Sequence, residues 1–394
     1  MTGTRRLRIF VLIDALGWTY VEDSRFLADL LPYRTPVRTF LGYSSGAVPT
    51  ILTGIPPAEH GHWNLFYRDP AHSPFRWLRA LQFLPESVLN HRVTRKLLKE
   101  LGRRVLGLGP LFECAVSPRL LPQLDWIEKR NIYAPGGIPG TQSIFDSLVE
   151  QRIPHRVYSY HQWTDAEILR QAGKDIESSD ATFFFLYLSE MDALLHSHCQ
   201  DAPTWQGRLE WYAEGLREVL SAARRVDPDA TLTVFSDHGM TPVRHHYDLA
   251  TQVGRLGLKM PDDYLAVYDS TMARFWFFSD RARAQIMERL HSVPCGHVLS
   301  DDDLRSLGVF FPDRRYGEVV LLLNPGWLFS NSDFNGNGWR PTGMHGYHPD
   351  DSYSDGVCLS THKPDVEPRT IADAYHCMRE AVSAGAPLEL PRIP

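Results

Sequence analysis

The sequence predicts an α/β protein built on a mainly parallel sheet sandwiched by helices, with inserted cap regions. Short apolar runs alternate with amphipathic helical patterns, as expected when each strand is followed by a crossover helix. Asp and His residues stand just after several of these runs, at the sheet edge where α/β proteins place their sites. The 394 residues contain no internal repeat or Gly/Ser linker. We therefore expect one catalytic domain over residues 1–394.

The expected core strands are short runs of apolar residues. The first of them, 8–13, ends directly before Asp14. Runs that are apolar throughout are typical of parallel strands buried on both faces. Further strands are expected at 37–41, 156–160, 182–188 and 231–235, and helices at 141–151 and 203–225.

Two stretches interrupt this alternation and predict insertions. Residues 66–135 are rich in Arg, Leu, Trp and Phe, and we expect them to form an inserted helical cap. Residues 260–330 contain strand patterns at 264–268 and 273–278, and we expect a second inserted subdomain there. Both insertions are expected to cover the site edge of the sheet.

Charge and cysteine content exclude several classes of protein. The 41 basic and 47 acidic residues give a net charge of −6, so no binding of a nucleic-acid polymer is expected. The five cysteines are odd in number and form no CxxC pair, which indicates a reducing compartment. They are Cys114, Cys199, Cys295, Cys358 and Cys377. No apolar run reaches 18 residues, so we expect a cytoplasmic protein; its oligomeric state is left open.

Asp237 and His238 follow the expected strand 231–235 and enter a glycine turn. Adjacent side chains at a strand end can bind one cation from two directions, and an Asp/His pair suits zinc or manganese. The alternative is an Asp that caps the loop beside an exposed His.

Asp192 and His196 follow the run 182–188. A helix at this point would place both side chains on one face by their i,i+4 spacing, where they could share a metal. His198 would then point elsewhere, and we expect it to be a structural or exposed histidine.

His345 lies in a loop with glycines on either side at 343 and 346, where backbone freedom lets one imidazole reach inward. His348 is the alternative. Asp14 is either a ligand or the cap of the next helix. Together with the two Asp/His pairs, His345 and Asp14 make six ligands, enough for two metal ions that clamp a phosphoryl group.

A nucleophile is expected in the segment 41–54. This segment passes from a strand through a small polar turn into a short helix, so Ser44 would lie at the helix N-terminus. Free N–H groups and the helix dipole favour a phosphate there, and a metal would activate the hydroxyl. The alternative is that Ser44 or Ser45 only caps the helix.

These segments resemble the alkaline phosphatase superfamily, and within it the nucleotide pyrophosphatase/phosphodiesterase type. The resemblance covers residues 7–65, 182–240 and 340–348. In that family the nucleophile stands nine residues before the Thr of a Thr-Gly pair, and counting back from Thr53 gives Ser44, with Ser45 as the alternative. The family then has Pro-x-x-His-Gly and an Asn, which correspond here to His60 and Asn64 at a slightly shorter spacing.

The resemblance implies an alkaline-phosphatase-like core with two divalent metal ions, expected to be Zn²⁺, with Mn²⁺ as the alternative. It assigns Asp192, His196 and His345 to one ion, and Asp14, Asp237 and His238 to the other, with the oxygen of Ser44 beside the second. It also implies hydrolysis of phosphodiester or phosphoanhydride bonds through a phosphoseryl intermediate, with Asn64 and the N–H after Ser44 contacting the phosphate.

One departure from the family leaves alternatives open. The Phe-Pro-Asn that usually follows the nucleophile is replaced by Ser-Gly-Ala at 45–47. Phosphomonoester hydrolysis, phosphonate hydrolysis and phosphotransfer therefore remain alternatives, as does a non-catalytic phosphate-ligand binder. The formylglycine signature of sulfatases is missing.

The expected substrate is a small phosphate ester or a nucleotide. Between residues 75 and 105, apolar residues at helical spacing precede six basic residues that are accompanied by a single acid, Glu100. This pattern predicts a basic amphipathic pair of helices that could contact an anionic membrane or an amphiphilic substrate, or simply a cap with a solvated charged face. The segment 124–133 and the nearby Gly136 and Gly137 are expected to line the pocket.

Overall fold

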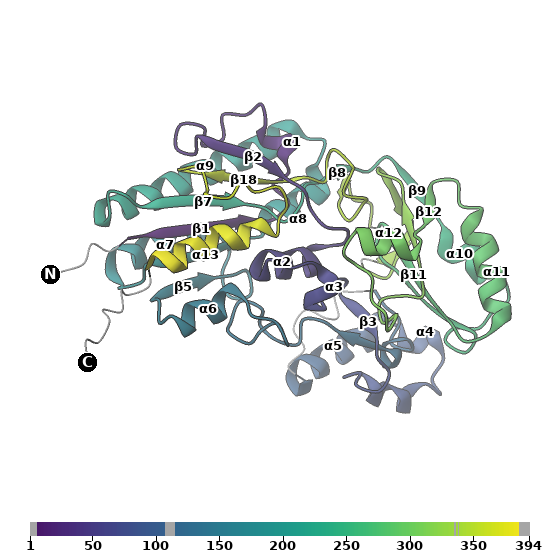
Figure 1. Ribbon diagram of the computed structural model, residues 1–394. Helices are drawn as coiled ribbons and strands as arrows, with labels where there is room; N and C mark the ends of the chain where they lie inside the picture. Colours follow the sequence, from purple (N-terminus) through teal and green to yellow (C-terminus); the bar gives the residue numbers. More distant parts are fainter. Residues whose placement is uncertain (1–5, 107–114, 335, 338, 386–394) are drawn as a thin grey trace.

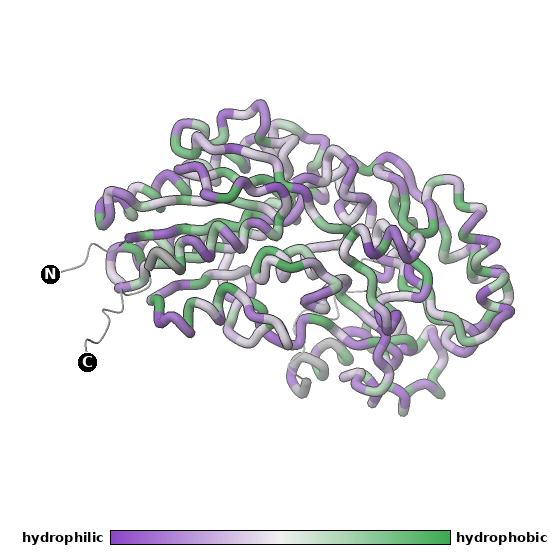
Figure 2. Tube along the Cα trace, in the orientation of Figure 1, coloured by the Kyte–Doolittle hydropathy of each residue, from purple (hydrophilic) through white to green (hydrophobic). Residues whose placement is uncertain are grey.

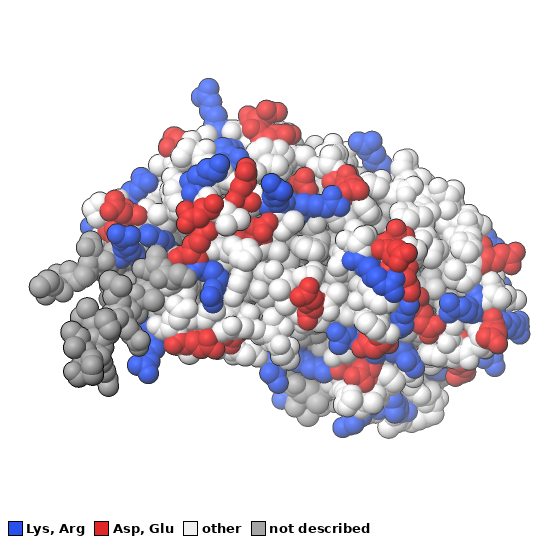
Figure 3. All heavy atoms as spheres, in the orientation of Figure 1, with Lys and Arg blue, Asp and Glu red and all other residues white. Residues whose placement is uncertain are grey.

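The structure is a computed structural model that describes residues 6–106, 115–334, 336–337 and 339–385. A six-stranded sheet with helices on both faces occupies one end of the molecule, and a smaller antiparallel sheet occupies the other (Figure 1). Basic and acidic side chains are interspersed over the face shown in Figure 3. No one-signed surface is visible there.

The six-stranded sheet has the order β2–β18–β7–β1–β6–β5. Four neighbouring strands run parallel: β7 (Thr231–Phe235), β1 (Arg8–Ile13), β6 (Phe183–Leu188) and β5 (His155–Tyr158). β18 (Gly356–Ser360) is antiparallel to both β7 and β2 (Tyr33–Val37). The prediction of a mainly parallel sheet is confirmed.

Two hydrophobic cores cover the faces of this sheet. One core packs β1, β6 and β7 against α7 (Asp165–Ser178), α8 (Glu190–His198) and α9 (Ala202–Val226). The other packs the opposite face against α2 (Ser44–Thr53), α6 (Ile144–Glu150) and α13 (Asp373–Gly385). Hydrophobic and hydrophilic positions alternate along these helices (Figure 2), because each buries only one stripe. Two short helices, α1 (Trp18–Val21) and α3 (Pro57–His60), lie in the loops after β1 and α2.

The strand expected at 37–41 is wrong, since β2 occupies Tyr33–Val37. Phe40 and Leu41 supplied the apolar pattern, but Leu41 packs in a separate core with Trp63. Gly42, at φ 134°, turns the chain toward α2. The other core strands and the helices at 141–151 and 203–225 occur within three residues of the expected bounds.

The second sheet has four antiparallel strands, in the order β10 (Tyr264–Tyr268), β11 (Met272–Phe277), β13 (Val319–Leu323) and β12 (Gly296–Val298). α10 (Leu249–Gly254) and α11 (Asp280–His291) pack on one face, and the region of α12 (Asp301–Ser306) contributes to a core on the other. Two short two-stranded ladders join β14 (Trp327–Phe329) to β9 (His245–Tyr247) and β15 (Asn331–Ser332) to β16 (Gly336–Asn337).

The cap segment packs on the second sheet. Its elements are β3 (Phe66–Arg68), η1 (Arg76–Leu81), α4 (Glu86–Leu89), α5 (Arg92–Leu106), η3 (Leu121–Gln123) and β4 (Leu124–Trp126). Phe75 and Leu78 share a core with Leu265 and Trp276 of the second sheet. The predicted assignment of 66–135 and 260–330 as two insertions in one catalytic domain stays a prediction.

The basic amphipathic pair of helices expected in the cap is wrong in part. One regular helix, α5, carries the basic residues, whereas the preceding segment forms a 3₁₀ helix and the four-residue α4, which starts after Pro85. Val93, Leu97 and Leu101 are exposed one turn apart on α5. Contact of this surface with a membrane or an amphiphile stays a prediction. The side chains of Lys99 and Arg103 lie outside the described residues.

Arg274 ties the second sheet to the cap. This fully buried side chain donates to both carboxylate oxygens of Asp269 at 2.6 and 3.2 Å, and to the carbonyl of Phe66 at 2.8 Å. It therefore joins the second sheet to a cap segment that lies 208 positions away in the sequence.

We expect Asp269→Ala to lower the free energy of unfolding by about 3–5 kcal/mol, because the buried guanidinium would keep no counter-charge. Asp302→Ala is the matched control, since Asp302 pairs with Arg305 on the exposed side of α12; its expected loss is below about 1 kcal/mol. Urea denaturation measures both. Equal losses would contradict the assigned role of the buried pair.

The cysteines that the structure describes, Cys199, Cys295, Cys358 and Cys377, are free and buried. Cys114 lies outside the described residues. Among the helices of the described chain, none combines the length and the apolar character that crossing a bilayer requires.

Candidate metal and nucleophile site

Three parallel strands end at the same edge of the central sheet. Ile13 at the end of β1 is in register with Leu188 at the end of β6, and Leu12 pairs with Phe235 at the end of β7. The residues that follow β6 and β7 therefore meet those that follow β1, although about 170 to 220 positions of sequence separate them.

Asp14, Asp237 and His238 form the first group of candidate ligands, and all three are buried. Nε2 of His238 lies 3.2 Å from Oδ2 of Asp237 and 3.6 Å from Oδ1 of Asp14. Nδ1 of His238 donates to the carbonyl of Gly239 at 2.9 Å. Because the proton is on Nδ1, the lone pair of Nε2 faces the two carboxylates.

Asp192, His196 and His345 form the second group. Asp192 and His196 lie one turn apart on α8, as predicted, with Nε2 of His196 3.3 Å from Oδ2 of Asp192. Nε2 of His345 lies 3.5 Å from the other oxygen of Asp192. Nδ1 of His196 bonds to the carbonyl of Gly343 at 2.9 Å, the kind of contact that orients a metal-binding imidazole.

The two groups lie side by side. The rings of His238 and His345 stack with centroids 3.8 Å apart and an interplanar angle of 12°. His345 follows β17 (Gly343–Met344), which pairs with β8 (Thr241–Pro242) just after His238. Gly346 permits this approach, since its φ is 87° and a Cβ there would lie 2.7 Å from the Tyr43 ring.

His198, which was expected to lie outside the site, and His348, the alternative to His345, both lie elsewhere. His198 is about half exposed and pairs with Asp201. His348 pairs with Asp350, which is largely exposed. The six residues expected as ligands are thus brought together, and these two are not.

The donor set fits divalent cations. Asp14, Asp192 and Asp237 each have one buried carboxylate oxygen without a hydrogen-bond partner in the described part of the chain. Buried carboxylate oxygens without donors are costly unless a cation is bound. Two Asp with one His, and one Asp with two His, are ligand sets that suit Zn²⁺ or Mn²⁺. The residues present therefore fit the two ions that the resemblance implies.

The pKa directions in the site reflect closely spaced like charges. Burial raises the pKa of Asp14 well above its ordinary value, and the neighbouring carboxylates of Asp237 and Asp192 raise it further. Burial opposes ionisation of Asp192 as well, but His196 and His345 outweigh it and hold the pKa below the usual range. A bound cation beside Asp14 would favour its ionised form.

The two candidate nucleophiles have different surroundings. Ser44 is the first residue of α2, and its hydroxyl lies 3.0 Å from Nε2 of His238, to which it can donate. The hydroxyl of Ser45 instead donates to the carbonyl of Trp63 at 2.9 Å. Ser44 is therefore the serine whose oxygen faces the first group of ligands.

Asn64, the candidate phosphate donor, is fully buried. Its amide nitrogen lies 3.4 Å from the sulfur of Met272, and its Oδ1 has no hydrogen-bond partner within the described residues. Gly42, two residues before Ser44, lies nearby, since a Cβ there would be 3.9 Å from this oxygen. The role of Asn64 as a phosphate donor stays a prediction.

His60 is held in its neutral form. Nδ1 accepts the amide of His62 at 3.2 Å, and Nε2 therefore donates to the hydroxyl of Thr50 at 3.0 Å, inside α2. Burial lowers the pKa of His60 to about 3.

We expect this histidine to make stability depend on pH. As the pH is lowered from 7 to 5, His60 becomes protonated in the unfolded chain, where its pKa is about 6.5. In the folded protein it stays neutral down to about pH 3, so the free energy of unfolding decreases as the pH is lowered. The expected loss from this group is about 2 kcal/mol. His60→Gln, whose amide nitrogen can replace Nε2 as the donor to Thr50, should flatten the pH dependence by that amount in denaturant titrations. An unchanged slope would contradict a neutral His60.

A cleft of about 250 Å³ opens beside Ser44. We refer to it as the nucleophile cleft. Residues 126–133 line one side of it, as expected for the segment 124–133, whereas Gly137 lines a neighbouring chamber. Aromatic side chains from other segments also line the cleft, namely those of Tyr160, His161 and Tyr187.

Tyr187 was missed by sequence reasoning. Its hydroxyl donates to Oδ2 of Asp14, which leaves Oδ1 directed at the ligand group. The signal available was a hydroxyl-bearing residue in the otherwise apolar strand β6, one position before the strand end. Such a residue on a buried strand needs a polar partner.

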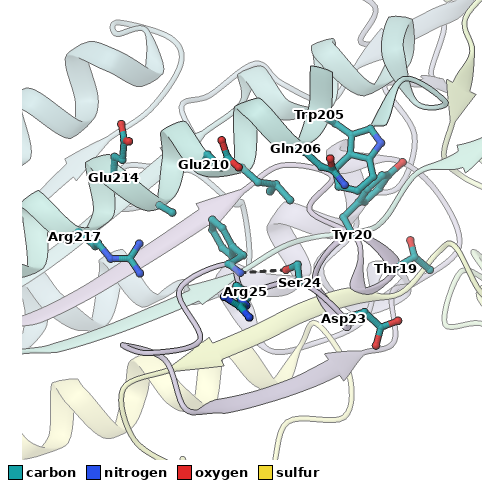
Figure 4. Close-up of a pocket in the computed structure, with 13 residues that line it drawn as sticks. Thr19, Tyr20, Asp23, Ser24, Arg25, Trp205, Gln206, Glu210, Glu214 and Arg217 are labelled. Carbon is teal, nitrogen blue, oxygen red and sulfur yellow. Dashed lines mark hydrogen bonds between the residues drawn. The ribbon is translucent and has the colours of Figure 1, made fainter. Parts of the chain in front are cut away.

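A cavity of about 570 Å³ lies between residues 19–26 and α9 (Figure 4). Tyr20 and Trp205 pack edge to face there, and charged side chains of both signs surround the opening. None of the predicted site residues lines this cavity. It is separate from the nucleophile cleft.

A family model described as type I phosphodiesterase/nucleotide pyrophosphatase matches residues 8–348. The chain belongs to this family. Membership in the type I phosphodiesterase/nucleotide pyrophosphatase family confirms the resemblance drawn from the Asp/His motifs. Hydrolysis of phosphodiester or nucleotide pyrophosphate bonds is the chemistry for which the family is named. Comparison with curated proteins gives no match.

Three solved structures are similar to this chain in fold. Murine ectonucleotide pyrophosphatase/phosphodiesterase 5 is similar with a TM-score of 0.66 at 14% identity, over 99% of this chain and 96% of that chain. The human protein of the same name gives 0.66 at 14%, over 96% and 95%. An inactive murine variant in complex with AMP gives 0.65 at 14%, over 99% and 96%. These likenesses confirm the alkaline-phosphatase-like core.

Proposed function

We propose that the protein hydrolyses phosphodiester or phosphoanhydride bonds through a covalent phosphoseryl intermediate on Ser44, in a centre that holds two divalent ions. The observation that carries this proposal is the 3.0 Å contact of the Ser44 hydroxyl with His238, inside the first of two adjoining ligand groups. A serine that only caps a helix would direct its hydroxyl at the first amides of the helix, whereas the hydroxyl of Ser44 faces buried carboxylates and imidazoles.

The chain's own residues define the steps. The three residues of each ligand group would hold one ion, and the ions, Zn²⁺ or alternatively Mn²⁺, would supply the positive charge that stabilises the transferring phosphoryl group. The Ser44 hydroxyl gives up its proton and its oxygen forms a bond to phosphorus, while the bond to the leaving oxygen breaks on the opposite side and that oxygen takes up a proton. Water then breaks the phosphoseryl bond and restores the Ser44 hydroxyl.

The start of α2 contributes to binding of the phosphate. The first amides of a helix have no acceptor within that helix, and the dipole is positive there. The N–H after Ser44 can therefore donate to an oxygen of the scissile phosphate. Asn64 is proposed to support another of these oxygens.

A nucleotide-type substrate is the proposed substrate class. The family acts on nucleotides, and the inactive murine variant binds AMP. In this chain, Tyr133 and Tyr160 line the nucleophile cleft and present apolar ring surface beside Ser44. We propose a cytoplasmic location, which the free state of the described cysteines supports.

Turnover of two chromogenic esters tests the reaction type. Metal-reconstituted protein is expected to hydrolyse bis-p-nitrophenyl phosphate with a kcat/KM at least about 10-fold above that for p-nitrophenyl phosphate. A 10-fold preference for the monoester would replace the diesterase proposal with a phosphomonoesterase. No turnover of either ester by folded protein, with Zn²⁺ or Mn²⁺ bound, would reject the hydrolase.

A further inference from the structure

A second chamber of about 490 Å³ adjoins the nucleophile cleft, and we refer to it as the basic chamber. His62, Trp126, Ile127, Lys129 and Arg130 line both spaces, so the two share a wall. The basic chamber extends from this wall to Gly137 and Thr141 on one side, and to Arg315 on the other. It brings together the cap, the loop after α3 and the loop before β13.

The charge on the chamber wall is mainly positive. Lys129, Arg130 and Arg315 line it, against Glu59 as the single acid among its lining residues. His60 and His62 also line it and add no charge, since burial lowers the pKa of His60 to about 3, and burial together with the nearby Arg315 lowers the pKa of His62 to about 4. The chain as a whole carries −6, so this local excess of positive charge runs against the overall balance.

Aromatic rings hold Arg315 in place, and its one ion pair among the described residues is long and partly exposed. Its guanidinium lies 5.0 Å from the ring centre of Phe311 and 5.7 Å from that of Tyr316. Its Nε lies 3.8 Å from a carboxylate oxygen of the exposed Asp313. This buried Nε has no hydrogen-bond partner in the described part of the chain. Aromatic rings can orient a guanidinium while leaving its donors free for a ligand.

The other two cations differ in how far they are neutralised. Lys129 forms an ion pair with the buried Asp125. Arg130 is exposed, and its guanidinium donates a hydrogen bond to the carbonyl of Gly136 at 3.3 Å. Arg130 and Arg315 therefore retain donors for an incoming anion, one at the shared wall and one deeper in the chamber.

From this geometry we infer that the basic chamber is a second anion subsite, which binds a phosphate group of the substrate other than the scissile one. This inference rests on the proposed function, since the scissile phosphate must lie at Ser44. Two arginines suit a phosphate because each offers several donors in a fixed plane. The protein should then favour substrates with more than one phosphate over simple diesters.

Two substrates separate this subsite from the reaction centre. ATP carries further phosphates beside the scissile bond, whereas thymidine 5′-monophosphate p-nitrophenyl ester carries none. Arg315 lines the basic chamber and not the nucleophile cleft. In Arg315→Gln, kcat/KM is therefore expected to fall about 10-fold for ATP and to change less than about 3-fold for the nitrophenyl ester. The double variant Arg130→Gln/Arg315→Gln is expected to lose up to about 100-fold for ATP. The double variant with Lys at both positions should keep most of the ATP activity. Arg281→Gln, on the exposed side of α11, is the control and should change neither.

Two results would overturn the inference: equal losses for both substrates, or no loss for ATP. Free phosphate is the other source of the same chemistry, so nitrophenyl ester turnover is also measured with added inorganic phosphate. One outcome is that inorganic phosphate changes this turnover in the wild type and not in the Gln variant, while both proteins hydrolyse ATP equally well. The chamber would then bind free phosphate, and its assignment to a phosphate of the substrate would be wrong.

Calorimetry keeps this test independent of catalysis. Metal-loaded Ser44→Ala protein is expected to bind ATP at least about 10-fold more tightly than the same protein with both arginines changed to Gln. If the wild-type protein hydrolyses none of the substrates, the proposed function is rejected and the inference of an anion subsite is not. Equal ATP affinities would reject the subsite alone.

Discussion

Ser44→Ala is expected to lower kcat for bis-p-nitrophenyl phosphate by roughly 10³-fold or more, because the hydroxyl of Ser44 faces the first ligand group, whereas that of Ser45 donates to Trp63. The small change in side chain removes one oxygen from the start of α2. The bound ions and the helix start remain, so KM is expected to change far less than kcat. Steady-state kinetics on metal-reconstituted protein, with metal content measured in parallel, gives the result.

Ser45→Ala is the matched control for this variant. It removes the hydroxyl that donates to Trp63 and is expected to cost about 1 kcal/mol of stability, with activity within a few fold of the wild type. The reverse result, with Ser45→Ala inactive and Ser44→Ala active, would move the nucleophile by one position. Equal activity of both variants would remove the phosphoseryl intermediate from the mechanism.

The parts of the site that follow from the sequence are those set by local pattern. The apolar run 8–13 fixed the position of Asp14 at a strand end, and the i,i+4 spacing of Asp192 and His196 correctly predicted their place on one helix face. Parallel strands end at one edge, so residues after β1, β6 and β7 had to meet. Local sequence also favoured His345 through its glycine neighbours.

Other parts depend on long-range packing that no local pattern encodes. Leu41 is apolar because it packs with Trp63, yet a run of apolar residues there suggested a core strand. Arg274 and Asp269 lie five positions apart, but the carbonyl that completes the pair belongs to Phe66, 208 positions away. The basic chamber likewise depends on how the cap and the loop before β13 pack together. Arg315 could not be connected to Arg130 from spacing alone.

Tyr43 shows how the second sheet supports the site. Its hydroxyl donates to Oγ1 of Thr271 at 2.8 Å, and Thr271 in turn donates to the carbonyl of Gly346, beside His345. Thr271 lies in the turn between β10 and β11. The second sheet thus reaches both the residue before the nucleophile and the loop that carries a candidate ligand, an arrangement in which distant segments fix ligand positions.

Asp237→Asn is expected to reduce the metal content from two ions to about one per chain and to lower kcat by roughly 10³-fold or more. Oδ1 of Asp237 accepts the amides of Ala15 and His238, at 3.2 and 3.1 Å, and an asparagine oxygen can keep both bonds. The substituted NH₂ group would replace Oδ2, the oxygen without a donor, and could bond to Nε2 of His238. The variant therefore removes a ligand while preserving the local fold.

The same substitution should have the opposite effect on the metal-free protein. Asp237 contributes to the raised pKa of Asp14, so removing its charge relieves repulsion between two buried carboxylates. The metal-free variant is expected to unfold about 2–4 °C above the metal-free wild type, and to gain less when metal is added. Asp227→Asn is the control, since this buried carboxylate accepts from the amide of Leu7, the residue before β1, and the variant should keep both ions. Two ions retained in Asp237→Asn, or a lower midpoint without metal, would show that Asp237 is structural and that the first ligand group is misassigned.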